Sequence, residues 1–294
     1  MRSWIYLYNN RKLVYHFIET ESNGRGTGNE TKERSGKGRC TVSQTDVILD
    51  GILDAGEILL KAGAEISRVE DTLRRMAVAY GFVRVDVFAI TSNIVVTVHA
   101  EDGSNITQTR RITGRSTNMR KIEQVNALSR RVCANPIPAE EFRETVADIS
   151  KMPAYSNRVI MAAYIMIAAS FAVFFGGTAL DGAAAAVCSL VQYVLSYYGG
   201  KIRLQPIILI IVESAAICLF ALLTVWIGLG SNINYIIIGN IMLLIPGVAL
   251  MTAVREMIMG ETISGVLGIC EAVVRAIAIA IGCALVLLGF GVKL

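Results

Sequence analysis

The most informative polar residues lie inside long apolar runs. Glu213 interrupts an apolar stretch with no other charged residue between Arg203 and Arg255. A carboxylate in hydrocarbon is costly, and such residues face a cavity, a partner or a proton path. Glu213 is therefore a candidate for ion or proton coupling. The plain alternative is a neutral Glu213 that bonds a neighbouring helix.

Asn240 and the pair Pro246-Gly247 lie in the same apolar region. Proline removes a backbone hydrogen bond and glycine loosens a helix. Broken helices near the bilayer midplane form many transporter sites. We expect Asn240, Pro246 and Gly247 to contact substrate, unless Pro246 is a mere kink and Asn240 only bonds another helix.

Glu271 and Arg275 are charged residues of the last apolar segment. Their i,i+4 spacing predicts an ion pair, which lowers the cost of either charge near the membrane. Because residues 262–292 are too long for one simple span, we expect this pair to lie near the cytoplasmic interface.

Few residues offer enzyme chemistry. The chain has two histidines, His16 and His99, and six cysteines without a CxxC motif. The spacing therefore predicts no metal site, and we expect no cofactor. His99, with Glu101 and Asp102 nearby, supports an alternative reading as a membrane-anchored hydrolase. No placed nucleophile accompanies His99, so we expect a protein that is not an enzyme.

A stripe of carboxylates follows one face of the first predicted helix. Such a stripe suggests a cation site, but acids near a helix N-terminus are also favoured by the helix dipole. The simpler interpretation is a solvated face. The stripe consists of Asp46, Asp50, Asp54 and Glu57.

The polar residues described above are distributed over two parts of the chain, one with the composition of a water-soluble domain and one with that of a membrane domain. Residues 158–294 hold six Lys/Arg and five Asp/Glu, separated by apolar runs of membrane-spanning length. We predict an all-α membrane domain over 158–294 with about five transmembrane helices, at 159–177, 180–199, 205–226, 233–253 and 264–291. Lys201, Arg203 and Arg255 fall in alternate loops, which predicts a cell-membrane protein with a cytoplasmic N-terminal domain and an external C-terminus.

Residues 46–152 are patterned like a water-soluble α+β domain. Helical periodicity, then alternation, then helical periodicity predicts the order ααβββαα, with a hairpin turn at Asp102-Gly103. Residues 46–157 hold fourteen Lys/Arg and fifteen Asp/Glu, so nucleic-acid binding is not expected. Residues 1–45 are basic and without apolar periodicity, and we predict a disordered tail.

Two motifs resemble the threonine/serine exporter family. One is AGEILLKAGAEISRVEDT at residues 55–72, and the other is LLIPGVAL at 243–250, followed by GETISG at 260–265. The resemblance covers about residues 46–292. It implies a cytoplasmic domain followed by five spans, forming one half of an exporter of small hydrophilic metabolites.

The resemblance also implies partners. Full-length members fuse this half to a second, smaller hydrophobic half, so the resemblance implies a separate small membrane protein as partner. Threonine and serine are the name-giving substrates, and some two-component relatives resemble succinate exporters. A third reading is a regulatory protein whose cytoplasmic domain senses a metabolite. The sequence leaves the coupling ion and a homo-oligomer open.

Overall fold

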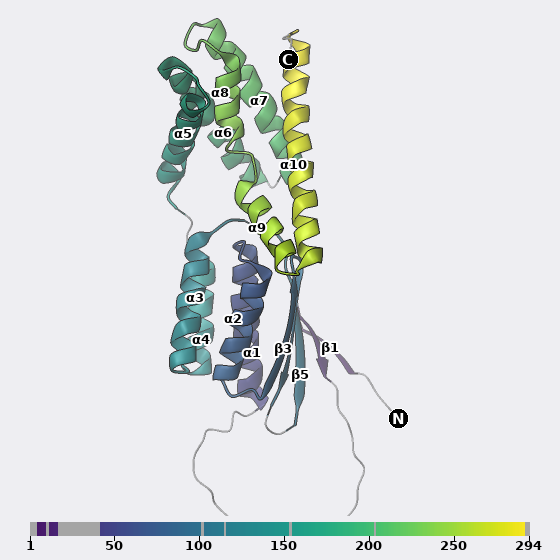
Figure 1. Cartoon of the computed structure of the whole chain (residues 1–294). Helices are drawn as coiled ribbons and strands as arrows, with labels where there is room; N and C mark the ends of the chain where they lie inside the picture. The colour runs from purple at the N-terminus through teal and green to yellow at the C-terminus, as the bar shows by residue number, and fades with distance from the viewer. Residues whose placement is uncertain are drawn as a thin grey trace, which may run out of the picture. The chain divides into compact units, whose positions relative to one another are not determined.

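The computed structural model describes residues 5–9, 12–16, 42–100, 103–114, 116–152, 155–202 and 204–291 (Figure 1). The chain forms two compact units. Unit 1 contains Met1–Pro153 with Met259–Ser264, and unit 2 contains Ala154–Ile258 with Gly265–Leu294.

Unit 1 is an antiparallel sheet covered on one face by two layers of helices, as Figure 1 shows. The inner helices are α1 (Val42–Lys61) and α2 (Ile66–Ala79), and the outer helices are α3 (Met119–Ala134) and α4 (Ala139–Lys151). The strands between α2 and α3 are β3 (Arg84–Ile90), β4 (Asn93–His99) and β5 (Asn105–Arg111). β4 lies between β3 and β5, with Val96 opposite both Val87 and Gln108.

The core of unit 1 follows from the two periodicities. Alternate residues of β4, namely Ile94, Val96 and Val98, are fully buried toward the helices. Phe142 of α4 is also fully buried and packs against α1 at Gly51, where a Cβ would collide with its ring. A glycine at this position therefore allows the inner and outer helix layers to approach closely.

The edge strand β3 is covered by α2. The backbone N–H of Ala89 donates to Glu70 Oε1 at 2.7 Å, so the carboxylate takes the place of a neighbouring strand. Burial raises the pKa of Glu70, while the Ala89 hydrogen bond acts in the opposite direction. Glu70 therefore joins a helix of the predicted family motif to the sheet edge.

The N-terminal segment differs from its prediction. Strands β1 (Ile5–Asn9) and β2 (Lys12–His16) pair with each other, and β2 extends the sheet along β5. The sequence analysis assigned these strands and the start of α1 to the tail at residues 1–45. The rest of that prediction, over residues 17–41, lies outside the described residues.

Unit 2 is entirely helical in its described part. Four helices are long and apolar enough to cross a membrane: α5 (Asn157–Phe174), α6 (Ala179–Ile202), α7 (Pro206–Trp226) and α10 (Thr262–Gly289). At 1.5 Å per residue, the 28-residue α10 is roughly 42 Å long, against a hydrocarbon core of about 30 Å. Its length agrees with the excess expected from the sequence.

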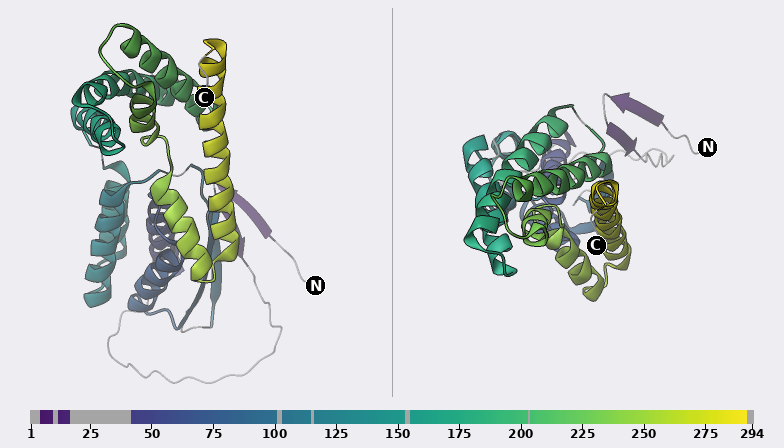
Figure 2. Two further views of the ribbon diagram at one scale, coloured as in Figure 1. Left: turned by 45° about the horizontal axis from the view of Figure 1, so that its top comes forward. Right: turned by 90° about the horizontal axis from the view of Figure 1, so that it is seen from above.

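The predicted span 233–253 is not one continuous helix. Figures 1 and 2 show two separate helices, α8 (Ile233–Ile241) and α9 (Gly247–Ile258), joined by a non-helical segment. A nine-residue helix such as α8 is roughly 14 Å long and cannot cross the hydrocarbon alone. Four of the five predicted spans are therefore long apolar helices, whereas the predicted span 233–253 is divided between α8 and α9 at the Pro246-Gly247 pair.

Small residues set the packing of unit 2. A Cβ at Gly239 of α8 would collide with the carbonyl oxygen of Ala168 in α5, and one at Gly282 of α10 would collide with Ser214 Oγ in α7. Close approach through small residues is the usual way in which helices pack in lipid. It brings α8 against α5, and α10 against α7 one residue after Glu213.

Candidate functional site

Glu213 is buried among the helices of unit 2. Its side chain on α7 is 4% exposed, and its Oε1 has no hydrogen-bond partner within the described residues. Ser196 of α6 lies near the carboxyl group, and the hydroxyl of Tyr164 of α5 donates to Ser196 Oγ at 3.5 Å. Three helices therefore contribute to one polar cluster, which we call the Glu213 cluster: Tyr164, Ser196 and Glu213.

Two amide side chains in the same unit are buried and incompletely satisfied. Asn240 of α8 is fully buried; its Nδ2 donates to its own helix at the Ile236 carbonyl, while its Oδ1 has no partner in the described part of the chain. Gln192 of α6 is 1% exposed, and neither amide atom has a partner there. A buried polar atom without a partner costs about 1–3 kcal/mol, so each of these atoms calls for an explanation.

The break between α8 and α9 begins two residues after Asn240. The Leu243 and Leu244 N–H groups donate to carbonyls three residues earlier, so the helix tightens before it ends. Pro246 has no N–H to donate to the Met242 carbonyl, and the Gly247 N–H turns back to Ile245. Helical bonding resumes when Leu250 donates to the Pro246 carbonyl. Pro246 and Gly247 thus lie at an interruption rather than at a kink.

Asp181 is a third kind of buried polar residue. It lies in the first turn of α6 and is 1% exposed. Its Oδ1 accepts the N–H groups of Ser231 and Asn232 at 2.6 and 2.8 Å, and its Oδ2 accepts the N–H and hydroxyl of Thr178 at 2.9 and 2.8 Å. Asp181 therefore ties the turn before α6 to the turn before α8, which is a structural role.

The pair Glu271–Arg275 is present on an outer face of α10. Arg275 Nη2 lies 2.7 Å from Glu271 Oε1, and the Glu271 side chain is more than half exposed. An exposed i,i+4 pair of this kind is worth about 0.3–0.5 kcal/mol. Its position at a membrane interface stays a prediction.

The hydrolase alternative depends on His99, whose contacts in the sheet are with other charged side chains. His99 Nε2 lies 3.5 Å from Asp86 Oδ2, which also pairs with Arg84 Nε at 3.0 Å. All three residues lie on the sheet face away from the helices, and Glu101 and Asp102 lie outside the described residues. Asp86 thus gives His99 a structural partner on the sheet.

The acidic stripe of α1 has a partner that the sequence analysis did not identify. Arg110 of β5 points to α1, with Nη1 2.6 Å from Asp54 and 3.3 Å from Glu57, and Nη2 3.8 Å from Asp50. Glu57 also pairs with Lys61 at 2.6 Å. Asp50, Asp54 and Glu57 of the stripe therefore belong to an ion-pair network between helix and sheet.

No group of three or more His, Cys, Asp or Glu side chains that could hold a metal occurs among the described residues. The residues that sequence reasoning missed are Tyr164, Gln192, Ser196, Asp181 and Arg110. Gln192 and Asp181 could have been noticed as polar residues near apolar runs. The other three acquire meaning only through neighbours on different elements.

Comparison with known proteins agrees with the motifs. A family model described as "Putative threonine/serine exporter" matches residues 50–289. The chain is 23% identical over 241 residues to a "Probable threonine/serine exporter" of Mycobacterium tuberculosis, an alignment that covers 81% of this chain and 45% of that relative. The chain therefore spans less than half of the relative's length. No solved structure resembles the chain closely enough to count as a match. Because the family model covers most of the chain, including both motifs, this protein belongs to the threonine/serine exporter family.

Proposed function

We propose that this chain is the larger part of an exporter of small hydrophilic metabolites, with threonine and serine as the first substrates to test and succinate as the alternative. The observation that carries the proposal is the set of buried, incompletely bonded polar side chains on apolar helices. Glu213, Gln192 and Asn240 come from α7, α6 and α8. An anchor for a soluble domain has no use for such costly groups, whereas a path for hydrophilic solutes needs them.

The proposed roles follow from chemistry and position. Glu213 takes up and releases the coupling proton, because it is the one carboxylate in the apolar run of α7 and the Ser196 hydroxyl lies near it. Asn240 contacts the substrate together with backbone groups of the interruption at Pro246 and Gly247, as freed backbone groups do in broken transporter helices. The segment from α8 to α9 then makes one interrupted crossing in addition to the four long helices.

The proposed orientation follows the positive-inside rule. Lys201, Arg203 and Arg255 lie on the cytoplasmic side with unit 1, and the C-terminal end of α10 lies outside. The proposed partner is a small hydrophobic membrane protein that corresponds to the family's second half.

The test of the coupling role is export by Glu213→Gln. Cells that express the chain with its partner are loaded with threonine- and serine-containing dipeptides, and excreted amino acids are measured. Glutamine keeps the size of the side chain but cannot release a proton, so we expect at least a tenfold loss of export with unchanged membrane abundance.

The matched control is Glu271→Gln, which makes the same chemical change at an exposed ion pair of α10. We expect its export to stay within twofold of wild type. Normal export by Glu213→Gln would remove the coupling role, and equal losses in both variants would show that the effect is not specific to the buried carboxylate.

A further inference from the structure

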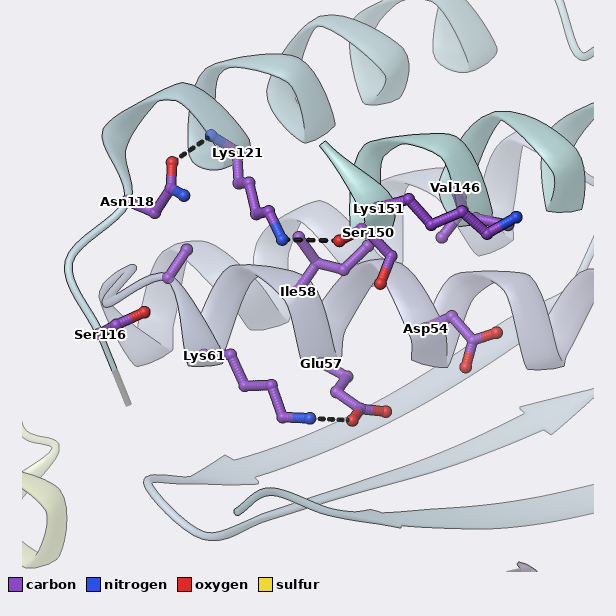
Figure 3. Close-up of a pocket in the computed structure, with 12 residues that line it drawn as sticks. Asp54, Glu57, Ile58, Lys61, Ser116, Asn118, Lys121, Val146, Ser150 and Lys151 are labelled. Atoms are coloured by element: carbon purple, nitrogen blue, oxygen red, sulfur yellow. Dashed lines mark hydrogen bonds and ion pairs between the residues drawn. The ribbon is translucent and has the colours of Figure 1, made fainter. Parts of the chain in front are cut away.

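A cavity of about 430 Å³ lies within unit 1, between α1 and the layer formed by α3 and α4 (Figure 3). Its volume falls within the range of about 300–1,000 Å³ that is typical of small-molecule sites. It is lined by Asp54, Glu57, Ile58, Lys61, Ala62, Ser116, Asn118, Lys121, Val146, Ala147, Ser150 and Lys151.

The two walls of the cavity carry different charges. The α1 wall presents the carboxylates Asp54 and Glu57, together with Lys61, which is paired to Glu57 at 2.6 Å. The opposite wall presents Lys121 of α3 and Lys151 of α4, as Figure 3 shows. No carboxylate among the described residues pairs with either of these lysines. Acidic side chains of α1 and basic side chains of α3 and α4 therefore line the same cavity.

The basic wall is prepared for a carboxylate. Asn118 caps α3, with its Oδ1 accepting the Lys121 N–H at 3.1 Å, so the amide NH2 group of Asn118 remains as a donor. The Lys121 ammonium donates to the Ser150 carbonyl at 2.7 Å, which uses one of its three N–H groups and fixes its direction. These donors lie at the N-terminus of α3, where the helix dipole also favours an anion.

We propose that this cavity binds an α-amino acid zwitterion, with its carboxylate at Lys121 and Asn118 and its ammonium at Asp54. A simple anion would meet the carboxylates of α1, and a simple cation would meet the two lysines. A small ligand that carries both charges satisfies both walls. That the amino acid is threonine or serine rests on the proposed function, whereas the charge pattern of the cavity does not.

The site also connects the ligand to the sheet. Asp54 is held by Arg110 of β5 at 2.6 Å, so a bound ammonium shares Asp54 with Arg110. Occupancy of the cavity thereby changes the ion-pair network between α1 and β5, and unit 1 acts as a sensor of the cytosolic amino acid.

The test is calorimetric titration of the purified full chain in lipid nanodiscs. We expect L-threonine and L-serine to bind, while N-acetyl-L-threonine, without the ammonium, and L-threoninamide, without the carboxylate, bind at least tenfold more weakly. Lys121→Met and Asp54→Asn should each weaken L-threonine binding at least tenfold. Arg120→Met, which removes a neighbouring exposed cation of α3 outside the cavity, should bind as wild type does.

Several results would overturn the site. These are no binding by wild type, equal affinity in Lys121→Met and Arg120→Met, equal affinity for N-acetyl-L-threonine, and tighter binding of succinate than of L-threonine. Loss of binding in Glu213→Gln would place the ligand in unit 2 instead. Thermal melting of each variant separates a lost site from lost folding. Because binding is measured without transport, an absent exporter activity and an absent cavity ligand are told apart.

Discussion

At the scale of single residues, the buried polar groups of unit 2 divide by how completely they are bonded. Asp181 accepts four hydrogen bonds from nearby turns, whereas Gln192 has none within the described residues. A carboxylate whose acceptors are filled by its own chain is part of the scaffold. Atoms that the fold leaves unbonded are the ones to which the proposed function assigns a substrate or a proton. This contrast separates Asp181 from Glu213, although both are acidic and buried.

Asp181→Asn should therefore damage folding rather than transport as such. The amide would turn an NH2 group toward N–H donors that now meet a carboxylate oxygen, at either the Thr178 or the Ser231–Asn232 end. Hydrogen bonds to a charged group are worth about 1.5–3 kcal/mol, and we expect a loss of about 2–3 kcal/mol. Thermal melting of the purified chain should show a clearly lower midpoint, together with reduced membrane abundance.

Glu271→Gln provides the comparison for this prediction, because it neutralises an acid in an exposed pair worth little stability. Its melting midpoint should stay close to wild type. An Asp181→Asn variant that melts with wild type would mean that the two turns are held by other contacts.

At the scale of helices and strands, local periodicity predicted most of unit 1. The faces of α1 and α2 and the alternation of β4 are set by which side chains meet the core, and this information is local in sequence. Pairing of β2 with β5 was not predictable in the same way, because it depends on an edge far along the chain. Arg110 was missed for the same reason, since its partners lie on α1.

Hydropathy predicted unit 2 less completely. Hydropathy is averaged over many residues, so residues 233–253 were predicted as one span. Pro246 interrupts that span because it has no N–H to donate to the Met242 carbonyl. The residues Pro246 and Gly247 were identified as special, but the length of the interruption was not. The Tyr164 and Ser196 hydroxyls became part of the site only through contact among three helices.

The interruption itself can be tested by removing its cause. In the double variant Pro246→Ala, Gly247→Ala, both positions favour helix, since proline costs about 3 kcal/mol and glycine about 1 kcal/mol relative to alanine. The α8 and α9 segments should then join, and backbone amides near Ile245 should exchange hydrogen more slowly. We expect export to fall at least fivefold at unchanged abundance.

Pro206→Ala is the control for this variant. Pro206 begins α7, where proline breaks no hydrogen bond, so export should remain near wild type. Wild-type flux in the double variant, with slowed exchange, would show that the interruption has no part in transport.

At the scale of the whole molecule, the chain joins a unit with its own apolar core to a unit of membrane-capable helices. Unit 1 has a closed apolar core, but the apolar helices of unit 2 are mostly uncovered by the chain itself. Only 11% of the most apolar stretch of α5 is buried within the structure, against 39% of the corresponding stretches of α6 and α7. Lipid covers such a face, and so does a second membrane protein.

Under the proposed function, export should depend on co-expression of a small hydrophobic protein corresponding to the family's second half. We expect excretion of threonine and serine only from cells that carry both proteins, and recovery of the partner when this chain is purified in mild detergent. A Met166→Trp substitution enlarges an exposed side chain on α5 and should reduce both co-purification and export if α5 forms the contact. Val274→Trp on α10 makes a similar change on another exposed face and serves as its control. Excretion by this chain alone, with a homo-oligomer in detergent, would replace the separate partner by further copies of the same chain.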